Sequence, residues 1–538
     1  MKQKVPTHTA EARKPAETKY NDVPFAILFL LHVAFIAFIA FTSGMDELNG
    51  KLKDSGSTYK VDPASSEDAS NSVNVGTTTV GGIVATLIAA MIVSSLFMKL
   101  ATILAEDLIH VTMKFTIGLM LVLALIFMAT GVIFAAIIYL VFVAIFVCYY
   151  RAVQDRIPFA GANLSIACTV VKRFPQLVMA AFATLVLNFL WMALWAVAML
   201  GVAAPGQERS IIVNSGSFDS SLCVDVANGN AFPWKEESDI SCPIYEGTGE
   251  KNDQPPGCCF CQSGDNTGYD LESSCSSGIG MDSLTYFGML ISFYWGGQVL
   301  QNIMHCTTAG TVASWWFTSD MGMSPVFDSF SRAMTWSFGS ICFGSLLVAI
   351  LKAVRQMLRE ARKNKNAQLF LCVIDCLLGV IEELLKIFNR YAFCFVAIYG
   401  HDFKTAGRAV FDLFKRLGWT TIINDDLIDM VLNVGSLGVG GITALFGYLY
   451  AVACGLDDSW QVLLAIIGFL FGFVMSSITL SVVSSAVATI FVCFADAPAA
   501  FFQTHPEHAN KLTNAWQQFH GEDMSVCNYR RYQTGGGY

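Results

Sequence analysis

The sequence is poor in charged residues, which make up 14% of its 538 positions, against roughly 25% in an average soluble protein. Apolar side chains make up 54%. A soluble globule of this size needs more polar surface than that, so a soluble enzyme and a disordered protein are excluded. The net charge of −9 also excludes a nucleic-acid binder, which needs Lys and Arg clustered on an exposed face.

The long apolar runs contain no Asp, Glu, Arg or Lys except Lys99, which lies near the end of its run. About 20 apolar helical residues cross a bilayer core of about 30 Å. Run 117–150 is too long for one span, and we interpret it as two helices broken near Gly131. The sequence predicts an all-α polytopic membrane bundle of about ten transmembrane helices, with runs at 25–41, 80–100, 117–150, 177–202, 286–304, 334–351, 434–454 and 463–494.

Few ionisable groups in the spans also argue against a membrane enzyme, which needs such groups to converge. We therefore expect no catalytic residue, no metal site and no cofactor.

Basic residues predict which side each loop faces, because cytoplasmic loops carry excess Lys and Arg. The N-terminal tail carries five and is placed inside, whereas segment 203–284 has three basic and thirteen acidic residues and is placed outside. The strongest basic cluster, 352–365, is placed inside. The chain must then cross three times between 284 and 352, and a short or broken helix near Gly310 is expected to supply the third crossing.

Segment 369–399 is apolar enough for a span, but acidic and basic residues interrupt it. We expect amphipathic helices at the cytoplasmic interface there, in preference to a crossing. The predicted regions are a cytoplasmic N-terminal tail (1–24), transmembrane helices 1–5 (25–202), an extracellular Cys-rich loop (203–284), transmembrane helices 6–8 including a broken or short helix (285–352), a cytoplasmic amphipathic segment (353–432), transmembrane helices 9–10 (433–495) and a cytoplasmic C-terminal tail (496–538).

The predicted outer loop holds six of the sixteen cysteines. An even number in a polar external loop predicts three disulfides, with fifteen possible pairings. Zinc is the alternative, because Cys258 and Cys261 have C-x-x-C spacing. The loop has no His, which favours disulfides among Cys223, Cys242, Cys258, Cys259, Cys261 and Cys275.

Aromatic and amide side chains concentrate in 286–317 and suggest a substrate path. Aromatic faces attract a desolvated cation by about 0.5–2 kcal/mol each, although Trp and Tyr also belt ordinary membrane interfaces. His305 would either couple transport to protons or be a satisfied core histidine. The candidate substrate-binding residues are Tyr294, Trp295, Gln298, His305, Trp315 and Trp316, with Asn188, Trp191 and Trp195 as secondary candidates.

Four strings in order resemble the choline transporter-like family: QVLQNIMHCTTAGTVASWWF (298–317), GSICFGSL (339–346), FNRYAFCFVAIYGHDF (388–403) and CFAD (493–496). The resemblance covers roughly residues 80–500. The string QNIMHCTTAG resembles the fungal, plant and protist branch of the family more than the animal branch. It implies about ten spans with cytoplasmic termini. It also implies transport of choline, in some members ethanolamine, with proton exchange. The short loop after the first span and the Cys-rich insert after the fifth depart from animal members.

We therefore expect a transporter of choline or a related small organic amine such as ethanolamine, facilitative or proton-coupled. The expected partners are this organic cation and membrane lipid, without nucleic acid; the oligomeric state is left open. The plasma membrane is the expected location. The alternatives are a transporter of another solute in the same fold, a channel, or a surface scaffold that uses the Cys-rich loop.

Overall fold

The computed structural model describes residues 19–45, 48, 66–203, 261–262, 269–271, 283–318, 324–361, 368–417 and 420–520. Two short strands, β1 (Cys261–Gln262) and β2 (Tyr269–Leu271), pair antiparallel. Of the six cysteines predicted to form disulfides, five lie outside the described residues, and only the backbone of Cys261 is described. The three disulfides stay a prediction.

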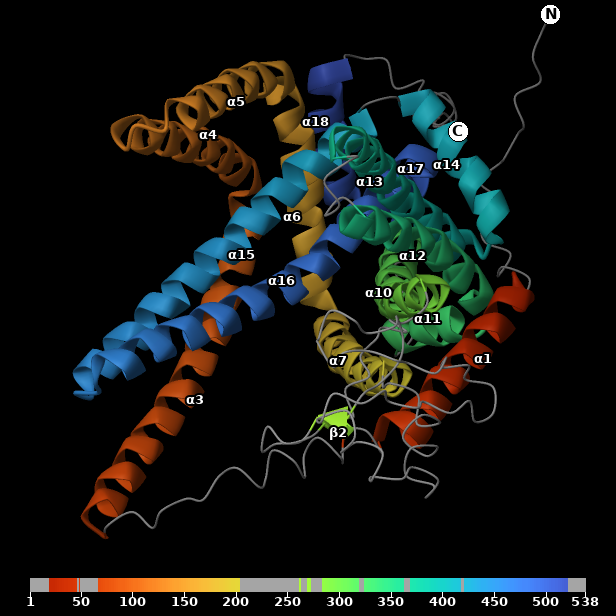
Figure 1. Ribbon diagram of the computed structural model, residues 1–538. Helices are drawn as coiled ribbons and strands as arrows, with labels where there is room; N and C mark the ends of the chain where they lie inside the picture. The colour runs from red at the N-terminus through yellow and green to blue at the C-terminus, as the bar shows by residue number, and fades with distance from the viewer. Residues whose placement is uncertain are drawn as a thin grey trace, which may run out of the picture. The chain divides into compact units, whose positions relative to one another are not determined.

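Almost all of the described chain is helical, as Figure 1 shows. It divides into two compact units, one made of Met1–Leu30, Val61–Leu190 and Tyr294–Tyr538, and a second made of Leu31–Lys60 and Trp191–Phe293. The helices are α1 (Val23–Ile39), the π-helical turn η1 (Ala40–Gly44), α3 (Ser66–Ile103), α4 (Ala105–Ala129), α5 (Ile133–Val153), the 3-10 turn η2 (Gln154–Arg156), α6 (Ile157–Arg173), α7 (Pro175–Ala203), α10 (Ser283–Phe317), α11 (Pro325–Met334), α12 (Phe338–Ala361), α13 (Gln368–Tyr399), α14 (Phe403–Leu417), α15 (Thr420–Ala453), α16 (Asp458–Asp496), α17 (Pro498–Thr504) and α18 (Pro506–His520).

Eight helical stretches of the described chain are long and apolar enough to cross a membrane. This confirms the predicted class, a polytopic helical membrane protein, while the exact number of spans stays a prediction. The predicted break near Gly131 is also confirmed, because α4 ends at Ala129 and α5 begins at Ile133. Gly131 has a φ of +79°, which glycine adopts without the clash that a Cβ causes.

The predicted break near Gly310 is wrong, because α10 is one continuous helix of 35 residues. The Thr and Ser side chains that suggested a break are satisfied within the helix: the hydroxyl of Thr311 donates to the carbonyl of Thr307, and that of Ser314 to the carbonyl of Gly310. A Cβ at Gly310 would lie 2.8 Å from Oγ of Ser329 on α11. The glycine therefore allows a close helix approach and does not bend α10.

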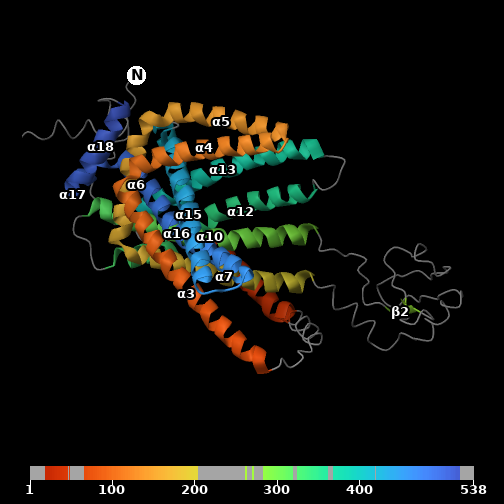
Figure 2. The ribbon, with the colours of Figure 1, turned by 90° about the vertical axis from the view of Figure 1, so that its left-hand side faces the viewer.

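The charges that argued against a crossing at 369–399 are paired in the structure. α13 lies beside α12 (Figure 2), and Nε of Arg355 on α12 lies 2.8 Å from Oδ1 of Asp375 on α13. Nη1 of the same arginine lies 2.7 Å from Oε2 of Glu382, which Lys386 also contacts at 2.9 Å. Ionisable residues inside membranes normally pair in this way. The charges of α13 therefore do not exclude a crossing.

Helices α15 and α16 form a hairpin that packs against α3 (Figure 1). Gly468 and Gly472 on α16 both face Thr443 on α15, and a Cβ at Gly468 would lie 2.5 Å from the Thr443 carbonyl oxygen. Small residues spaced four apart let two helix backbones approach closely. The spacing therefore serves close packing, which positions the middle of α16 beside α15.

Helix α6 is covered on all sides, with thirteen of its seventeen residues buried. Phe159 packs edge-on against Phe491 of α16 and Trp516 of α18, and the Asn163 amide donates to the Val487 carbonyl of α16 at 3.4 Å. α6 therefore links α16 to the C-terminal helix α18.

A labelling experiment decides on which side the α12–α13 connection lies. If α10 and α13 each cross once in addition to the eight apolar stretches, the ten crossings still place both termini inside, but the connection is then outside. In a cysteine-depleted variant, we expect Asn366→Cys to react with an impermeant maleimide on intact cells and Thr405→Cys to react only after permeabilisation. If both cysteines need permeabilisation, segment 353–432 is cytoplasmic, as its charges predict.

Candidate functional site

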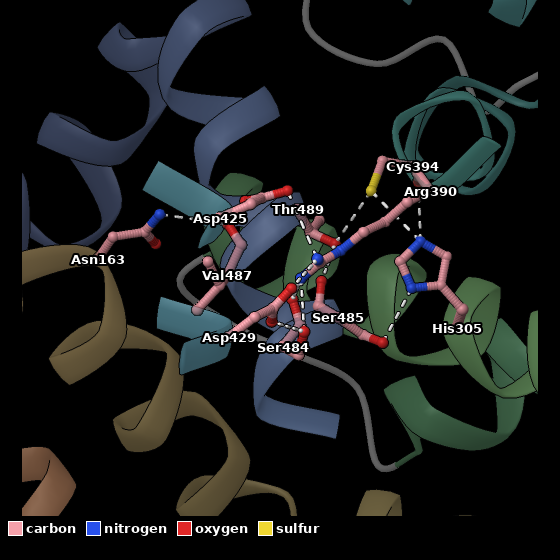
Figure 3. Close-up of polar contacts among 10 residues, drawn as sticks. All are labelled: Asn163, His305, Arg390, Cys394, Asp425, Asp429, Ser484, Ser485, Val487 and Thr489. Atoms are coloured by element: carbon pink, nitrogen blue, oxygen red, sulfur yellow. Dashed lines mark hydrogen bonds and ion pairs between the residues drawn. The ribbon is translucent and has the colours of Figure 1, made fainter. Parts of the chain in front are cut away.

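Four helices of the first unit bring polar and ionised side chains together, as Figure 3 shows. His305 is 9% and Asp425 4% exposed, so both are buried. An ionisable residue among apolar membrane helices is a functional-site candidate by default, because its burial is costly. The cluster consists of His305 from α10, Arg390 and Cys394 from α13, Asp425 and Asp429 from α15, and Ser484 and Ser485 from α16.

Arg390 holds this cluster together. Its Nη1 donates to Oδ2 of Asp429 at 2.9 Å, and its Nη2 donates to the carbonyl oxygen and to Oγ of Ser484, each at 2.6 Å. The Ser484 hydroxyl in turn donates to Oδ1 of Asp429 at 2.7 Å. Hydrogen bonds to ionised groups are shorter and stronger than neutral ones. The closed ring of three residues therefore ties α13, α15 and α16 together.

Asp425 lies one helical turn before Asp429 and meets the same guanidinium more loosely. Its Oδ2 lies 3.5 Å from Nη1 of Arg390, a longer contact than the 2.9 Å hydrogen bond from the same nitrogen to Asp429. Its other polar neighbours are the buried hydroxyl of Tyr391 and the buried amide of Asn424, both of which interact with the Asp425 carboxylate. Neutral groups and one longer ion pair therefore surround the Asp425 carboxylate, whereas Asp429 makes a short charged hydrogen bond.

The ionised members of the cluster carry unequal charge. Two carboxylates, Asp425 and Asp429, face one guanidinium, Arg390, which leaves one negative charge in excess. A buried charge is costly unless it is paired. One monovalent cation beside Asp425 would balance the cluster.

His305 belongs to the same cluster, and both ring nitrogens are engaged. Nε2 lies 2.9 Å from the Arg390 carbonyl oxygen, which can only accept, so this nitrogen carries a proton. Nδ1 lies 2.9 Å from Oγ of Ser485 and accepts from that hydroxyl in the neutral ring. These contacts are those of a satisfied core histidine, the alternative interpretation of His305, and its part in substrate binding stays a prediction.

The three predicted tryptophans of α10 lie at two separate levels and are packed. Trp295 donates its indole N–H to the Cys342 carbonyl at 3.0 Å, and Trp316 donates to the Ala497 carbonyl at 3.0 Å and stacks on Phe501. The ring of Trp315 contacts α17 and the His505 ring that follows it. Twenty residues at 1.5 Å each separate Trp295 from Trp315 by about 30 Å. α10 therefore does not bring these aromatics to one site.

Tyr294 and Gln298 are less enclosed. Tyr294 is half-buried, and Nζ of Lys352 lies 5.7 Å from its ring centroid, within the range of a cation–π contact. Gln298 donates its amide to Oε1 of Gln301 at 2.9 Å, on the same helix. Of the predicted aromatics, Tyr294 is thus the one that already accepts a cation on its face.

The secondary candidates take part in helix packing. Within the second unit, Trp191 and Trp195 of α7 donate their indole N–H groups to the carbonyls of Phe293 and Met289 on α10, at 3.2 and 3.0 Å. Asn188 donates to the carbonyl of Thr184 in its own helix. The two tryptophans therefore make contacts between helices and Asn188 bonds within its own helix, and their part in a substrate site stays a prediction.

Sequence reasoning missed Arg390, Asp425 and Asp429 because it placed residues 353–432 at the cytoplasmic interface. A signal was present, since Asp425 and Asp429 are four residues apart, share a helix face and directly precede an apolar run. Arg390 also lies within the FNR string that carried the family resemblance. In the described part of the chain, no three His, Cys, Asp or Glu residues are grouped so as to hold a metal ion.

Comparison with known proteins places the cluster in a family context. Residues 137–499, which contain the whole cluster, match the family model described as plasma-membrane choline transporter. The chain is 27% identical to Protein PNS1 of Debaryomyces hansenii, over 94% of this chain and 89% of that protein. It is 25% identical to a CTL-like protein of Dictyostelium discoideum (92% and 75%) and 26% identical to Protein PNS1 of Saccharomyces cerevisiae (93% and 84%).

Replacing Arg390 with Gln tests the central ring. The variant leaves two carboxylates close together without a counter-charge, and removing one partner of a buried pair costs about 3 kcal/mol of folding stability. We expect a lower thermal unfolding midpoint in detergent, and partial recovery in Arg390→Gln/Asp429→Asn, which removes one carboxylate. Arg151→Gln, an exposed position on α5, is the charge-matched control. An unchanged midpoint for Arg390→Gln would show that the ring does not hold the helices.

Proposed function

The chain belongs to the plasma-membrane choline transporter family, and on this premise we propose that it carries choline or a related small organic amine such as ethanolamine across a membrane. Its family and its apolar helices identify it as a multi-pass membrane transporter. The substrate, the coupling and the plasma-membrane location belong to the proposal.

The observation that supports a cationic substrate is the excess negative charge at Asp425. A quaternary ammonium group carries one positive charge and no N–H donor, so it balances a carboxylate without requiring hydrogen-bond geometry. Ethanolamine carries the same charge with N–H donors that a carboxylate such as that of Asp425 can accept. Both amines therefore match the charge of the cluster.

Arg390 supplies a reason why such a cation can bind without disrupting the fold. Its strong hydrogen bonds go to Asp429 and Ser484, and its contact with Asp425 is longer, at 3.5 Å. A cation that binds Asp425 in place of Arg390 leaves the ring of Arg390, Asp429 and Ser484 intact. In this proposal Asp425 recognises the charge of the substrate, and Asp429 positions Arg390.

Among the predicted aromatics, Tyr294 is retained as a second cation contact, at a different level of α10 from His305. Lys352 already occupies a position over its ring. A substrate cation passing this level would compete with that ammonium group for the aromatic face.

The decisive experiment is uptake of labelled choline and ethanolamine into proteoliposomes, with and without a pH gradient. We expect saturable uptake by the wild-type protein and, for Asp425→Asn, an affinity lower by about 2 kcal/mol, roughly thirtyfold, because the partner of a buried charge is lost. Asp458→Asn, an exposed carboxylate at the start of α16, should behave as wild type. Absence of saturable uptake of either amine would reject the proposed substrate class. Saturable uptake with unchanged affinity in Asp425→Asn would reject only the role of Asp425.

A second test concerns the aromatic contact. Tyr294→Leu should weaken choline affinity by about 0.5–2 kcal/mol while Tyr294→Phe retains it, because the ring face and not the hydroxyl attracts the cation. Trp316→Leu, which removes a packed indole, should lower the thermal unfolding midpoint instead. Wild-type uptake kinetics in Tyr294→Leu would place the substrate path elsewhere.

A further inference from the structure

Helix α14 carries a stripe of basic residues on its exposed side. Lys404, Arg408, Phe411 and Lys415 are all exposed and follow the spacing i, i+4, i+7, i+11, which places them on one face. The stripe is about 17 Å long at 1.5 Å per residue. Neighbouring cations along it are separated by about a Debye length or less, so their fields add.

The opposite face of α14 is fixed to the bundle. Phe403, Ala406, Val410 and Leu413 are buried there. Phe414 also packs edge-on against Tyr391 of α13, with ring centroids 5.6 Å apart. Because this face is anchored, the basic stripe has a fixed orientation relative to α13.

The cations of the stripe are not used within the described part of the protein. Lys404, Arg408 and Lys415 make no ion pair among the described residues, whereas the adjacent Arg416 lies 3.5 Å from Asp496. The helix carries four basic residues against one acidic residue, Asp412. Its exposed side is therefore a surface of net positive charge without a partner in the described chain.

Chain connectivity places α14 close to the start of a membrane span. α13 ends at Tyr399, α14 runs from Phe403 to Leu417, and the apolar span within α15 begins at Ile423. Three residues precede α14 and only a few follow it before that span. The basic stripe therefore lies within reach of lipid headgroups, which long Lys and Arg side chains contact readily.

We propose that this stripe binds the headgroups of anionic phospholipids. Phosphodiester groups with a net negative charge complement the three unpaired cations. Phe411 is 68% exposed between them, although it also contacts Phe388. An exposed aromatic ring between cations suits the headgroup boundary, where aromatic side chains are accommodated, and it would disfavour a fully aqueous partner such as an acidic peptide. The site is separate from the Asp425 cluster and does not depend on the substrate proposed above.

The test counts bound lipids on the full-length protein, purified in mild detergent, by native mass spectrometry during titration with phosphatidylserine or phosphatidylcholine. We expect the wild-type protein to retain phosphatidylserine preferentially. Each cation removed should weaken retention roughly fivefold, so that Lys404→Gln/Arg408→Gln/Lys415→Gln needs roughly a hundredfold more phosphatidylserine. The swap Lys404→Arg/Arg408→Lys/Lys415→Arg, which keeps the charge, should retain it.

The matched control is Arg151→Gln/Lys172→Gln/Arg173→Gln, which removes the same charge from exposed positions on α5 and α6 and should bind as wild type. The proposal fails if the α14 glutamine variant retains phosphatidylserine as wild type does, or if the control loses as much. It also fails if phosphatidylcholine is retained equally well. Should the triple variant not fold, the three single variants carry the same test with a roughly fivefold effect each.

Discussion

The ring of Arg390, Asp429 and Ser484 is the contact on which the membrane core of the first unit depends. It joins three helices through hydrogen bonds of 2.6–2.9 Å that involve ionised groups. The cost of burying these charges is offset only while all three are in place. The positions of α13, α15 and α16 are thus linked, and a displacement of one helix breaks hydrogen bonds to both others.

The rest of the packing keeps this ring within reach. Gly468 and Gly472 allow α16 to lie against Thr443 of α15, so Ser484, further along α16, reaches Asp429. On the α10 side, the continuous helix places the His305 ring against the Arg390 carbonyl and Ser485. In membrane bundles, small residues commonly lie where two helix backbones approach closely. Polar residues form hydrogen bonds between helices and fix their register.

Much of the fold followed from apolar length alone, since helix length and lack of charge report directly on membrane crossing. The break at Gly131 was predictable because a run of that length exceeds one span. The break at Gly310 was predicted wrongly, because a glycine in a sequence signals either a bend or a close approach, and only the position of Ser329 distinguishes the two. The charges of α13 argued against a membrane crossing because their pairing partners, such as Arg355 and Asp429, lie on other helices. The sequence alone does not show these pairs.

The candidate site also depends on contacts between helices that the sequence alone does not show. Aromatic residues are conspicuous in 286–317 and predict a cation-binding site there. Each aromatic face, however, attracts a cation by only about 0.5–2 kcal/mol. An unbalanced buried charge costs several kcal/mol before any ligand arrives. Two carboxylates one turn apart and an arginine about 35 residues earlier in the chain are individually inconspicuous, and their excess charge exists only once α13 and α15 are packed together. Where the two effects compete, the larger one decides, so we expect Asp425 to contribute more than any single aromatic residue to the recognition of a cation.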